Sequence, residues 1–334
     1  MPTILEVHDL VKKYGDFTAV NGISFDIQEG EIFSLLGPNG AGKTTTISVL
    51  STLYTLTSGE ALVGGHSVSK EPMAVRQLIG VVPQDLAIYD DLTARENLSF
   101  WGQMYGLSGK PLKSRIDQVL EQIGLSDKAD QRIKTYSGGM KRRVNIGVGL
   151  LHRPRLLFMD EPTVGIDPQS RRAILDSVKD LNKQGMTVLY TTHYMEEAQE
   201  LSDRVGIIDH GELIALGTQA ELNQQVGEND TLILHLGEGE GAIAGAIAGA
   251  IAGAPTSAIA GAEALAAAVR DLPGVLKVDV SDHSIAIIAP EAEVILAPVI
   301  TKANELGVKI RSVDIQEPNL EAVFLSLTGR ALRD

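Results

Sequence analysis

The chain has 334 residues, 44% of them hydrophobic and 22% charged, which is enough for two domains with ordinary globular cores. Its net charge of −14 argues against a protein that binds nucleic acid through a general basic surface. It contains no cysteine, and this excludes disulfide bonds and thiolate metal sites.

The first two-thirds of the chain alternates strand-like and helix-like segments, which predicts an α/β domain with a largely parallel sheet. Residues 31–36 form an apolar run typical of a buried strand, and residues 43–53 are predicted to be helical. Similar apolar runs at residues 156–159 and 187–190 predict strands that are covered on both faces.

The turn after residue 36 carries the pattern G-x-x-x-x-G-K-[ST]. Glycines let the backbone curl so that its N–H groups face an anion, and the following helix N-terminus favours negative charge. We therefore predict a phosphate-binding loop, with Lys43 on the β- and γ-phosphates and Thr44 at Mg²⁺. A glycine-rich turn with a chance lysine is the alternative, which the flanking strand and helix disfavour. The predicted loop comprises Gly37, Pro38, Asn39, Gly40, Ala41, Gly42, Lys43, Thr44 and Thr45.

Residues 92–135 have helical periodicity, and we expect a helical insert that extends to about residue 150. It contains Phe100, Trp101, Met104 and Tyr105, and helical spacing places the last three on one face. This face is either a groove for a helix of a partner protein or the core of the insert itself, and the sequence leaves both open.

The apolar strand at residues 156–159 ends in Asp160 and Glu161. Ligands of α/β sheets sit at the carboxyl ends of strands, and successive residues of a strand point in different directions. We therefore expect Asp160 to hold Mg²⁺ through its hydration shell and Glu161 to orient an attacking water. The alternative is an acidic turn before Pro162 without a functional role. The predicted phosphate-binding loop in the same chain disfavours this alternative.

The remaining chain has a different character and predicts the order β-α-β-β-α-β of a ferredoxin-like domain, followed by a short helix. The interval between the first strand and first helix holds a repeated Gly-Ala-Ile-Ala tetrapeptide at residues 241–262. A flexible loop and an ordered contact both remain possible for this repeat. The predicted elements are residues 231–236, 262–272, 275–280, 284–289, 291–306, 308–315 and 319–327.

Ser137-Gly138-Gly139 opens a predicted helix shortly before the strand that ends Asp160-Glu161-Pro162, and this arrangement resembles the signature of the ABC (ATP-binding cassette) ATPases. Four single residues fall in the order that this family requires. They are similar to the family's adenine-stacking aromatic, Q-loop glutamine, D-loop aspartate and switch histidine, and they are Tyr14, Gln84, Asp167 and His193.

The resemblance implies an α/β P-loop cassette with a helical subdomain at residues 1–227 and a small α+β accessory domain at residues 228–334. It implies ATP and Mg²⁺ as cofactors, with Gln84 joining Thr44 and Asp160 at the metal, and with Glu161, His193 and Gln84 in catalysis. It also implies head-to-tail pairing with a second cassette, either a second copy of this chain in a homodimer or a close relative, in which Ser137, Gly138 and Gly139 cap the γ-phosphate bound by the partner subunit. Asp167 is a further nucleotide-binding residue that the resemblance implies.

Two sequence segments resemble those of the daunorubicin-resistance ATPases of ABC-2 type exporters. They are the motif Tyr136-Ser137-Gly138-Gly139-Met140 and the segment from Glu317 to Phe324. This implies an ATPase that drives export through a separate permease at the cytoplasmic face of the membrane, with no nucleic acid as a partner. The start of the chain lacks the features of a signal peptide, and residues 241–262 hold few residues that favour lipid, so we expect no membrane span.

Two alternatives belong to other classes. A soluble ABC ATPase of translation or DNA repair is disfavoured because the chain has one cassette and no long coiled coil splits it. A small-molecule kinase with a P-loop is disfavoured by the helix start at Ser137.

Overall fold

The computed structural model of the chain describes residues 2–226, 230–236, 258–281, 284–316 and 320–328. The chain divides into two compact units, of which the first reaches Gln219 and the second runs from Ala220 to Ser326. The predicted domain boundary at residues 227 and 228 stays a prediction. In the described part, no helix combines the length and the apolar character that a membrane crossing requires.

A six-stranded sheet forms the centre of the first unit, in the order β10-β9-β3-β8-β7-β6. Its neighbours pair in parallel except for β10, which pairs antiparallel with β9. Every residue of β3, β7 and β8 is buried, which confirms that these apolar runs are strands covered on both faces. The strands are β3 (Ile32–Leu36), β6 (Ile79–Val82), β7 (Leu156–Asp160), β8 (Thr187–Thr192), β9 (Arg204–Asp209) and β10 (Glu212–Gly217).

A second, antiparallel sheet has the order β2-β1-β4-β5 and was not predicted. Its long strands alternate buried and exposed residues only in part, because several register shifts interrupt the pairing of β1 with β2. Its buried face shares a core with the six-stranded sheet, where the rings of Phe25 and Phe33 stack 5.1 Å apart. The strands are β1 (Thr3–Tyr14), β2 (Phe17–Gln28), β4 (Ser58–Val63) and β5 (His66–Ser67).

The helices outside the predicted insert connect the strands of these two sheets. The helix after the phosphate loop ends at Leu50, three residues earlier than predicted, because Thr52 takes a left-handed backbone with φ 64°. These helices are α1 (Lys43–Leu50), α2 (Pro72–Leu78), α6 (Pro168–Lys183) and α7 (Met195–Leu201), and α8 (Gln219–Val226) follows β10.

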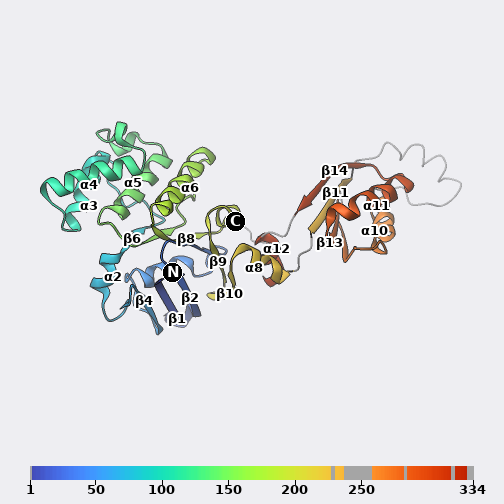
Figure 1. Cartoon of the computed structure of the whole chain (residues 1–334), viewed down its shortest axis with the longest axis horizontal. Coiled ribbons are helices and arrows are strands. Elements are labelled where there is room, and N and C mark those ends of the chain that lie inside the picture. Colours follow the sequence, from blue (N-terminus) through green and yellow to red (C-terminus); the bar gives the residue numbers. More distant parts are fainter. Residues whose placement is uncertain (1, 227–229, 237–257, 282–283, 317–319, 329–334) are drawn as a thin grey trace. The chain divides into compact units, whose positions relative to one another are not determined.

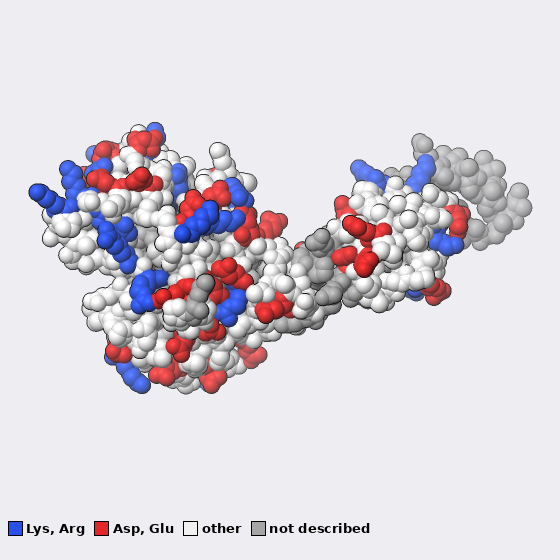
Figure 2. All heavy atoms as spheres, in the orientation of Figure 1, with Lys and Arg blue, Asp and Glu red and all other residues white. Residues whose placement is uncertain are grey.

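The predicted insert is helical, and Figure 1 shows α3, α4 and α5 gathered at one end of the first unit, opposite β1, β2 and β4. Thr93 and Glu96 form a reciprocal capping box at the start of α3. Figure 2 shows acidic and basic side chains intermixed over this region, where Arg95 pairs with Asp117 at 2.6 Å. Its elements are α3 (Ala94–Met104), α4 (Gly109–Gln122), the 3₁₀ turns η1 (Ser126–Lys128) and η2 (Ile133–Thr135), and α5 (Gly138–Leu150).

The second unit has the predicted element order β-α-β-β-α-β, in an antiparallel sheet of order β12-β13-β11-β14. Alternate residues of β11 and β13 are buried, and they share a core with apolar residues of α10 and α11. Figure 1 shows both helices beside this sheet. The elements are β11 (Asp230–Leu236), α10 (Ala258–Arg270), β12 (Lys277–Ser281), β13 (Ser284–Ala289), α11 (Ala292–Glu305), β14 (Ile310–Gln316) and α12 (Leu320–Thr328).

The predicted loop at residues 241–262 is wrong at its end, since α10 already begins at Ala258. A run of alanines has high helix propensity, and this extends the helix back into the repeat-rich segment. The repeat itself, at residues 241–253, lies outside the described residues.

Candidate functional site

The loop at residues 37–42 leads from β3 into α1, and its shape requires glycine. A Cβ on Gly37 would lie 2.1 Å from the carbonyl oxygen of Ile208, and one on Gly42 would lie 2.6 Å from that of Ala19. Gly40 has φ 81° and Gly42 has φ 108°, and residues other than glycine rarely adopt such positive φ angles. Within the loop, Ala41 is buried, while Asn39 and Gly40 are exposed.

Lys43 begins α1 and is 4% exposed. Its ammonium donates hydrogen bonds to the carbonyl oxygens of Gly37 at 2.6 Å and Pro38 at 2.9 Å. The same nitrogen lies 2.9 Å from Oε1 of Glu161, which is also 4% exposed. The lysine of the loop and the second carboxylate of β7 are therefore in direct contact, in a place where water does not screen their charges.

Asp160 ends β7 beside the hydroxyl groups of two neighbouring segments. Thr44 donates to its Oδ1 at 3.2 Å, and Thr191 of β8 donates to the same atom at 2.7 Å. Burial raises the pKa of the Asp160 carboxyl above its ordinary value, and the two hydroxyl hydrogen bonds oppose that rise. Of the predicted loop, Thr44 is exposed and Thr45 is partly buried.

Glu161 follows Asp160 with a left-handed backbone at φ 43°, which is strained for a side chain of this kind. Thr191 holds it there, because the Glu161 N–H lies within hydrogen-bonding distance of the Thr191 carbonyl oxygen and, at 3.0 Å, of its hydroxyl. Oε2 of Glu161 lies 3.0 Å from Nδ1 of His193, which is 9% exposed. The structure therefore brings together Lys43, Glu161 and His193, three residues far apart in the sequence.

Tyr14 lies at the end of β1 and is 43% exposed. Its ring meets that of Tyr54 edge to face, with centroids 6.0 Å apart. The ammonium of Lys12 lies 4.9 Å from the Tyr14 centroid and donates to the carbonyl oxygen of Thr55 at 2.8 Å. Tyr54 could not be singled out from the sequence, because only the fold places residues 14 and 54 side by side.

Gln84 is exposed in the loop after β6. Residues of α5 hold this loop, since Arg142 donates to the carbonyl oxygen of Pro83 at 3.0 Å. Asn145 accepts the N–H of Ala87 at 3.0 Å and donates to the carbonyl oxygen of Pro83 at 3.3 Å. The helix that follows the Ser-Gly-Gly motif therefore positions the segment that carries Gln84, and neither Arg142 nor Asn145 was predicted.

The Ser-Gly-Gly motif and Asp167 lie at two helix N-termini. Ser137 caps α5 by accepting the Met140 N–H, and Asp167 caps α6 by accepting the Ser170 N–H at 3.0 Å. Both capping residues and Gly138 are exposed, whereas Gly139 is buried against α6. The hydrogen bonds of Ser137 and Asp167 therefore stay within the first turns of their own helices.

The aromatic cluster of the insert divides between core and surface. Trp101 is partly buried against the main core and donates its indole N–H to the carbonyl oxygen of Ala87 at 3.0 Å. Phe100, Met104 and Tyr105 are at least 39% exposed. Of the three residues predicted on one helix face, Trp101 is therefore turned inward by its hydrogen bond to Ala87, whereas Met104 and Tyr105 stay largely exposed.

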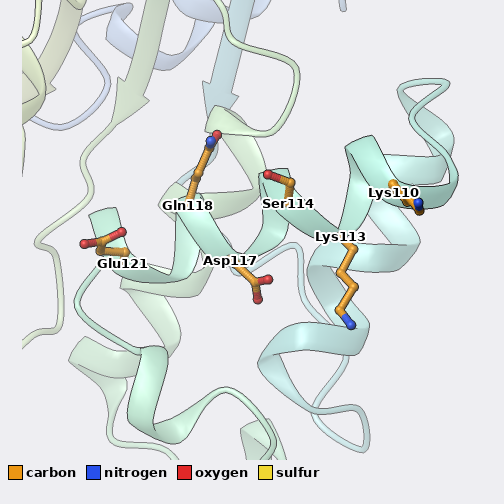
Figure 3. A pocket seen from close by; sticks show the side chains of 6 residues that line it. All are labelled: Lys110, Lys113, Ser114, Asp117, Gln118 and Glu121. Atoms are coloured by element: carbon orange, nitrogen blue, oxygen red, sulfur yellow. The ribbon is translucent and has the colours of Figure 1, made fainter.

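A pocket of about 400 Å³ lies along α4, and Figure 3 shows the side chains that line it. Its lining comes from a single helix and contains none of the predicted site residues. The lining residues are Lys110, Lys113, Ser114, Asp117, Gln118 and Glu121. Solvated side chains of one helix do not converge on a common point, so the pocket is a poor candidate for the functional site.

Comparisons with known proteins agree with this geometry. The family model described as ABC transporter matches residues 20–164. The linearmycin resistance ATP-binding protein LnrL of Bacillus subtilis is 48% identical over 333 residues, which are 99% of this chain and 100% of that protein. The daunorubicin resistance ATP-binding protein DrrA3 of Streptomyces coeruleorubidus is 36% identical, over 98% of this chain and 96% of its own.

Solved structures match the first two-thirds of the chain. The ADP conformation of MJ1267, an ATP-binding cassette of an ABC transporter, is 26% identical with a TM-score of 0.60, and the match covers 66% of this chain and 93% of that one. A dimeric post-hydrolysis state of the cassette MJ0796, bound to ADP and Pi, is 27% identical with a TM-score of 0.58. That match covers 64% of this chain and 98% of the other.

Proposed function

The chain belongs to the ATP-hydrolysing, ATP-binding proteins of the ABC transporter family, and from that premise we propose that it drives export of a small molecule through a separate membrane-spanning permease. The observation that carries the proposal is the buried contact of Lys43, Glu161 and His193 in one site. The relatives LnrL and DrrA3 are both named for drug resistance, which favours a transporter over a non-transport ATPase.

In the proposed site, Lys43 and backbone N–H groups between residues 39 and 45 hold the β- and γ-phosphates, and the exposed ring of Tyr14 stacks on adenine. Glu161 orients the attacking water, and its strained backbone fixes the direction of the carboxylate. His193, at 3.0 Å from Glu161, lies where it can contact the γ-phosphate and keep that carboxylate oriented.

The residues present fit a magnesium ion. Mg²⁺ prefers oxygen ligands and in nucleotide sites takes one or two protein groups together with phosphate oxygens. The Thr44 hydroxyl and the Asp160 carboxylate offer this pair of oxygens 3.2 Å apart, and Gln84 is the third proposed ligand, from an exposed loop. In the described part of the chain no cluster of three metal-binding acids, histidines or cysteines occurs, as suits an ion that relies on its substrate. When bound, Mg²⁺ neutralises charge on the phosphates.

We propose that two copies of the chain pair head to tail, so that Ser137 and Gly138 of one copy cap the γ-phosphate bound by the other. The exposed N-terminus of α5 is suited to an anion, because its first N–H groups point outward along the helix axis. The dimeric state of the similar cassette MJ0796 supports this arrangement.

The permease contact is proposed on the exposed apolar residues beside the Gln84 loop. Phe100 meets both Tyr89 and Trp101 edge to face, at 5.1 and 5.4 Å, and Met104 is 69% exposed. A cytoplasmic helix of a permease could bury these side chains and place the ATPase at the inner face of the membrane. Residues 228–334 are proposed as an accessory domain that regulates the ATPase or contacts another subunit.

Replacing Glu161 by Gln tests the proposed function. The amide keeps the shape of the side chain but cannot accept a proton from water, so we expect hydrolysis to fall at least about 100-fold. ATP affinity should change less than about threefold, and ATP should hold the variant as a dimer.

The exposed variant Glu121→Gln on α4 is the matched control and should hydrolyse ATP like the wild type. Phosphate release and light scattering with ATP measure both effects. Rapid hydrolysis by Glu161→Gln would remove Glu161 from the proposed role.

A further inference from the structure

A buried carboxylate that the sequence did not reveal lies behind the proposed catalytic pair. Glu197 of α7 is 2% exposed, and its Oε1 accepts the hydroxyl of Thr163 at 2.7 Å. Its Oε2 accepts the hydroxyls of Tyr190 and Thr192, both at 2.9 Å. Nε of Arg171 lies 3.6 Å from Oε1, beyond hydrogen-bonding distance. Glu197 therefore joins α7 to β8, to the segment after β7 and to α6.

Packing alone does not account for this carboxylate. Ala198 and Leu201 already bury the apolar side of α7, and a buried charge is costly unless its surroundings compensate it. Compensation is incomplete, since Nε of Arg171 is buried without a hydrogen-bond partner in the described structure. The charge of Glu197 also contributes to the raised pKa of Tyr190, after the larger effect of burial. Buried polar groups that cost stability are often retained where they fix the positions of the groups around them.

The donors to Glu197 lie next to the two catalytic candidates. Thr163 is two residues after Glu161, and Thr192 is one residue before His193. The Thr192 hydroxyl also accepts the N–H of Tyr194 at 2.9 Å, which shapes the turn that carries His193. The Glu197 carboxylate therefore holds both the segment that carries Glu161 and the turn that carries His193. The side chains of Glu161 and His193 meet at 3.0 Å.

A second connection leads to Asp167, one of the proposed nucleotide-binding residues. Arg171 lies in the first turn of α6, where its N–H donates to the carbonyl oxygen of Asp167 at 2.8 Å. Its guanidinium lies 4.3 Å from the ring centroid of Tyr194, whose ring is 4.1 Å from that of His193. A shift of Asp167 would therefore move Arg171 relative to both Glu197 and Tyr194.

We propose that Glu197 is a positioning residue that sets the mutual orientation of Glu161 and His193 and links it, through Arg171, to Asp167. This inference rests on the proposed function, because it takes Glu161 and His193 as the catalytic pair. A displacement of Asp167 would reach the catalytic pair through Arg171 and Glu197.

The first test replaces Glu197 by Gln, which keeps the shape but removes the charge and one acceptor. We expect kcat to fall roughly 10- to 100-fold, because small misplacements of catalytic groups have effects of this size. The Kd for ATP should stay within about twofold of the wild type. Glu196→Gln is the matched control, since Glu196 is the exposed neighbour on the same helix, and it should behave as the wild type.

A second pair of variants keeps the test decisive if Glu197→Gln folds poorly. Thr192→Val has nearly the same shape and loses the hydroxyl, whereas Thr192→Ser retains it. We expect the valine variant to lose kcat like Glu197→Gln and the serine variant to keep most of it. Equal activity of the two would overturn the proposal, as would an unchanged kcat in a folded Glu197→Gln protein.

A double-mutant cycle separates positioning from general stability. If Glu197 acts through His193, Glu197→Gln should reduce single-turnover hydrolysis less than about twofold in a His193→Ala background. If Glu197→Gln reduces hydrolysis as much in the His193→Ala background as in the wild type, Glu197 acts independently of His193 and the proposal is overturned. The proposed function stands or falls separately, because Glu161→Gln decides it in a chain with Glu197 intact.

Discussion

The two units of the chain bury different kinds of side chain. In the first unit Lys43, Asp160, Glu161, His193 and Glu197 are all at most 9% exposed, and Glu161 contacts both Lys43 and His193. In the second unit every buried side chain among the described residues is apolar, and its ion pairs lie at the surface. Buried charge costs stability, whereas apolar burial provides it, so we expect changes of buried residues to affect chemistry most in the first unit and stability most in the second.

The comparison predicts that loss of a buried charge in the first unit destroys function. Lys43→Ala removes the ammonium that contacts Gly37, Pro38 and Glu161, and with it the charged partner of the phosphates. We expect about 4 kcal/mol of binding free energy to be lost, which is roughly a thousandfold in Kd for ATP. Titration with a fluorescent ATP analogue measures this, with the exposed Lys113→Ala as control. A Kd within threefold of the wild type would contradict the assignment of Lys43.

In the second unit, a cavity should reduce stability without reducing chemistry. Ile287→Ala in β13 opens the core against α10 and α11, and we expect the unfolding transition of this unit to lose about 2–4 kcal/mol. The neighbouring Ile288 points to the opposite face and is only partly buried, so Ile288→Ala should cost less. Denaturant titration with ATPase assays on both variants measures the contrast. Loss of hydrolysis in the folded Ile287→Ala protein would show that the second unit takes part in the chemistry.

Adjacent glycines separate packing from function within the first unit. A Cβ on Gly139 would lie 2.2 Å from Oγ of Ser170, so Gly139→Ala should cost about 1–3 kcal/mol of folding stability. A Cβ on Gly138 would meet only Ile166, at 3.6 Å, which is an ordinary contact. Gly138→Ala should therefore keep its stability and lose ATP-dependent dimerisation, as measured by thermal unfolding and size-exclusion chromatography. The reverse pattern would mean that Gly138 serves packing and not the neighbouring nucleotide.

The smallest expected effect concerns pH. Because burial raises the pKa of Asp160, the folded protein binds this proton more tightly than the unfolded chain, so stability falls as pH rises through the raised pKa. Asp160→Asn replaces the buried carboxyl group by a neutral amide and so removes this loss of stability at higher pH. Without nucleotide or metal, its melting temperature should exceed that of the wild type most at neutral pH and above, and the difference should shrink as pH falls. A difference in melting temperature that grows as pH falls would contradict this prediction.

Much of the fold is predictable because local pattern and burial agree. The runs at β3, β7 and β8 are apolar throughout because both faces of the sheet are covered, and β13 follows strict alternation. The long strands β1 and β2 were missed because register shifts break their alternation. The fold therefore follows from the sequence where each strand has a regular environment.

The site is less predictable, because its geometry comes from distant segments. Glu196, Glu197 and Glu200 are alike in the sequence, and only the packing of α7 shows that Glu197 faces inward. The same is true of Tyr54 and Arg142, whose partners lie far along the chain. Motif residues such as Lys43 could be singled out because their type and spacing predict the chemistry, whereas residues that orient them have no motif.

The contact between Lys43 and Glu161 has a kinetic consequence. The Lys43 ammonium has three N–H donors, and its partners are the Gly37 carbonyl, the Pro38 carbonyl and Glu161, so a bound phosphate would have to displace at least one of them. We therefore expect ATP binding to proceed in two phases, a concentration-dependent encounter and a rearrangement whose rate saturates with ATP. If Glu161 is the partner displaced, its carboxylate would become available to water only after the phosphates are seated.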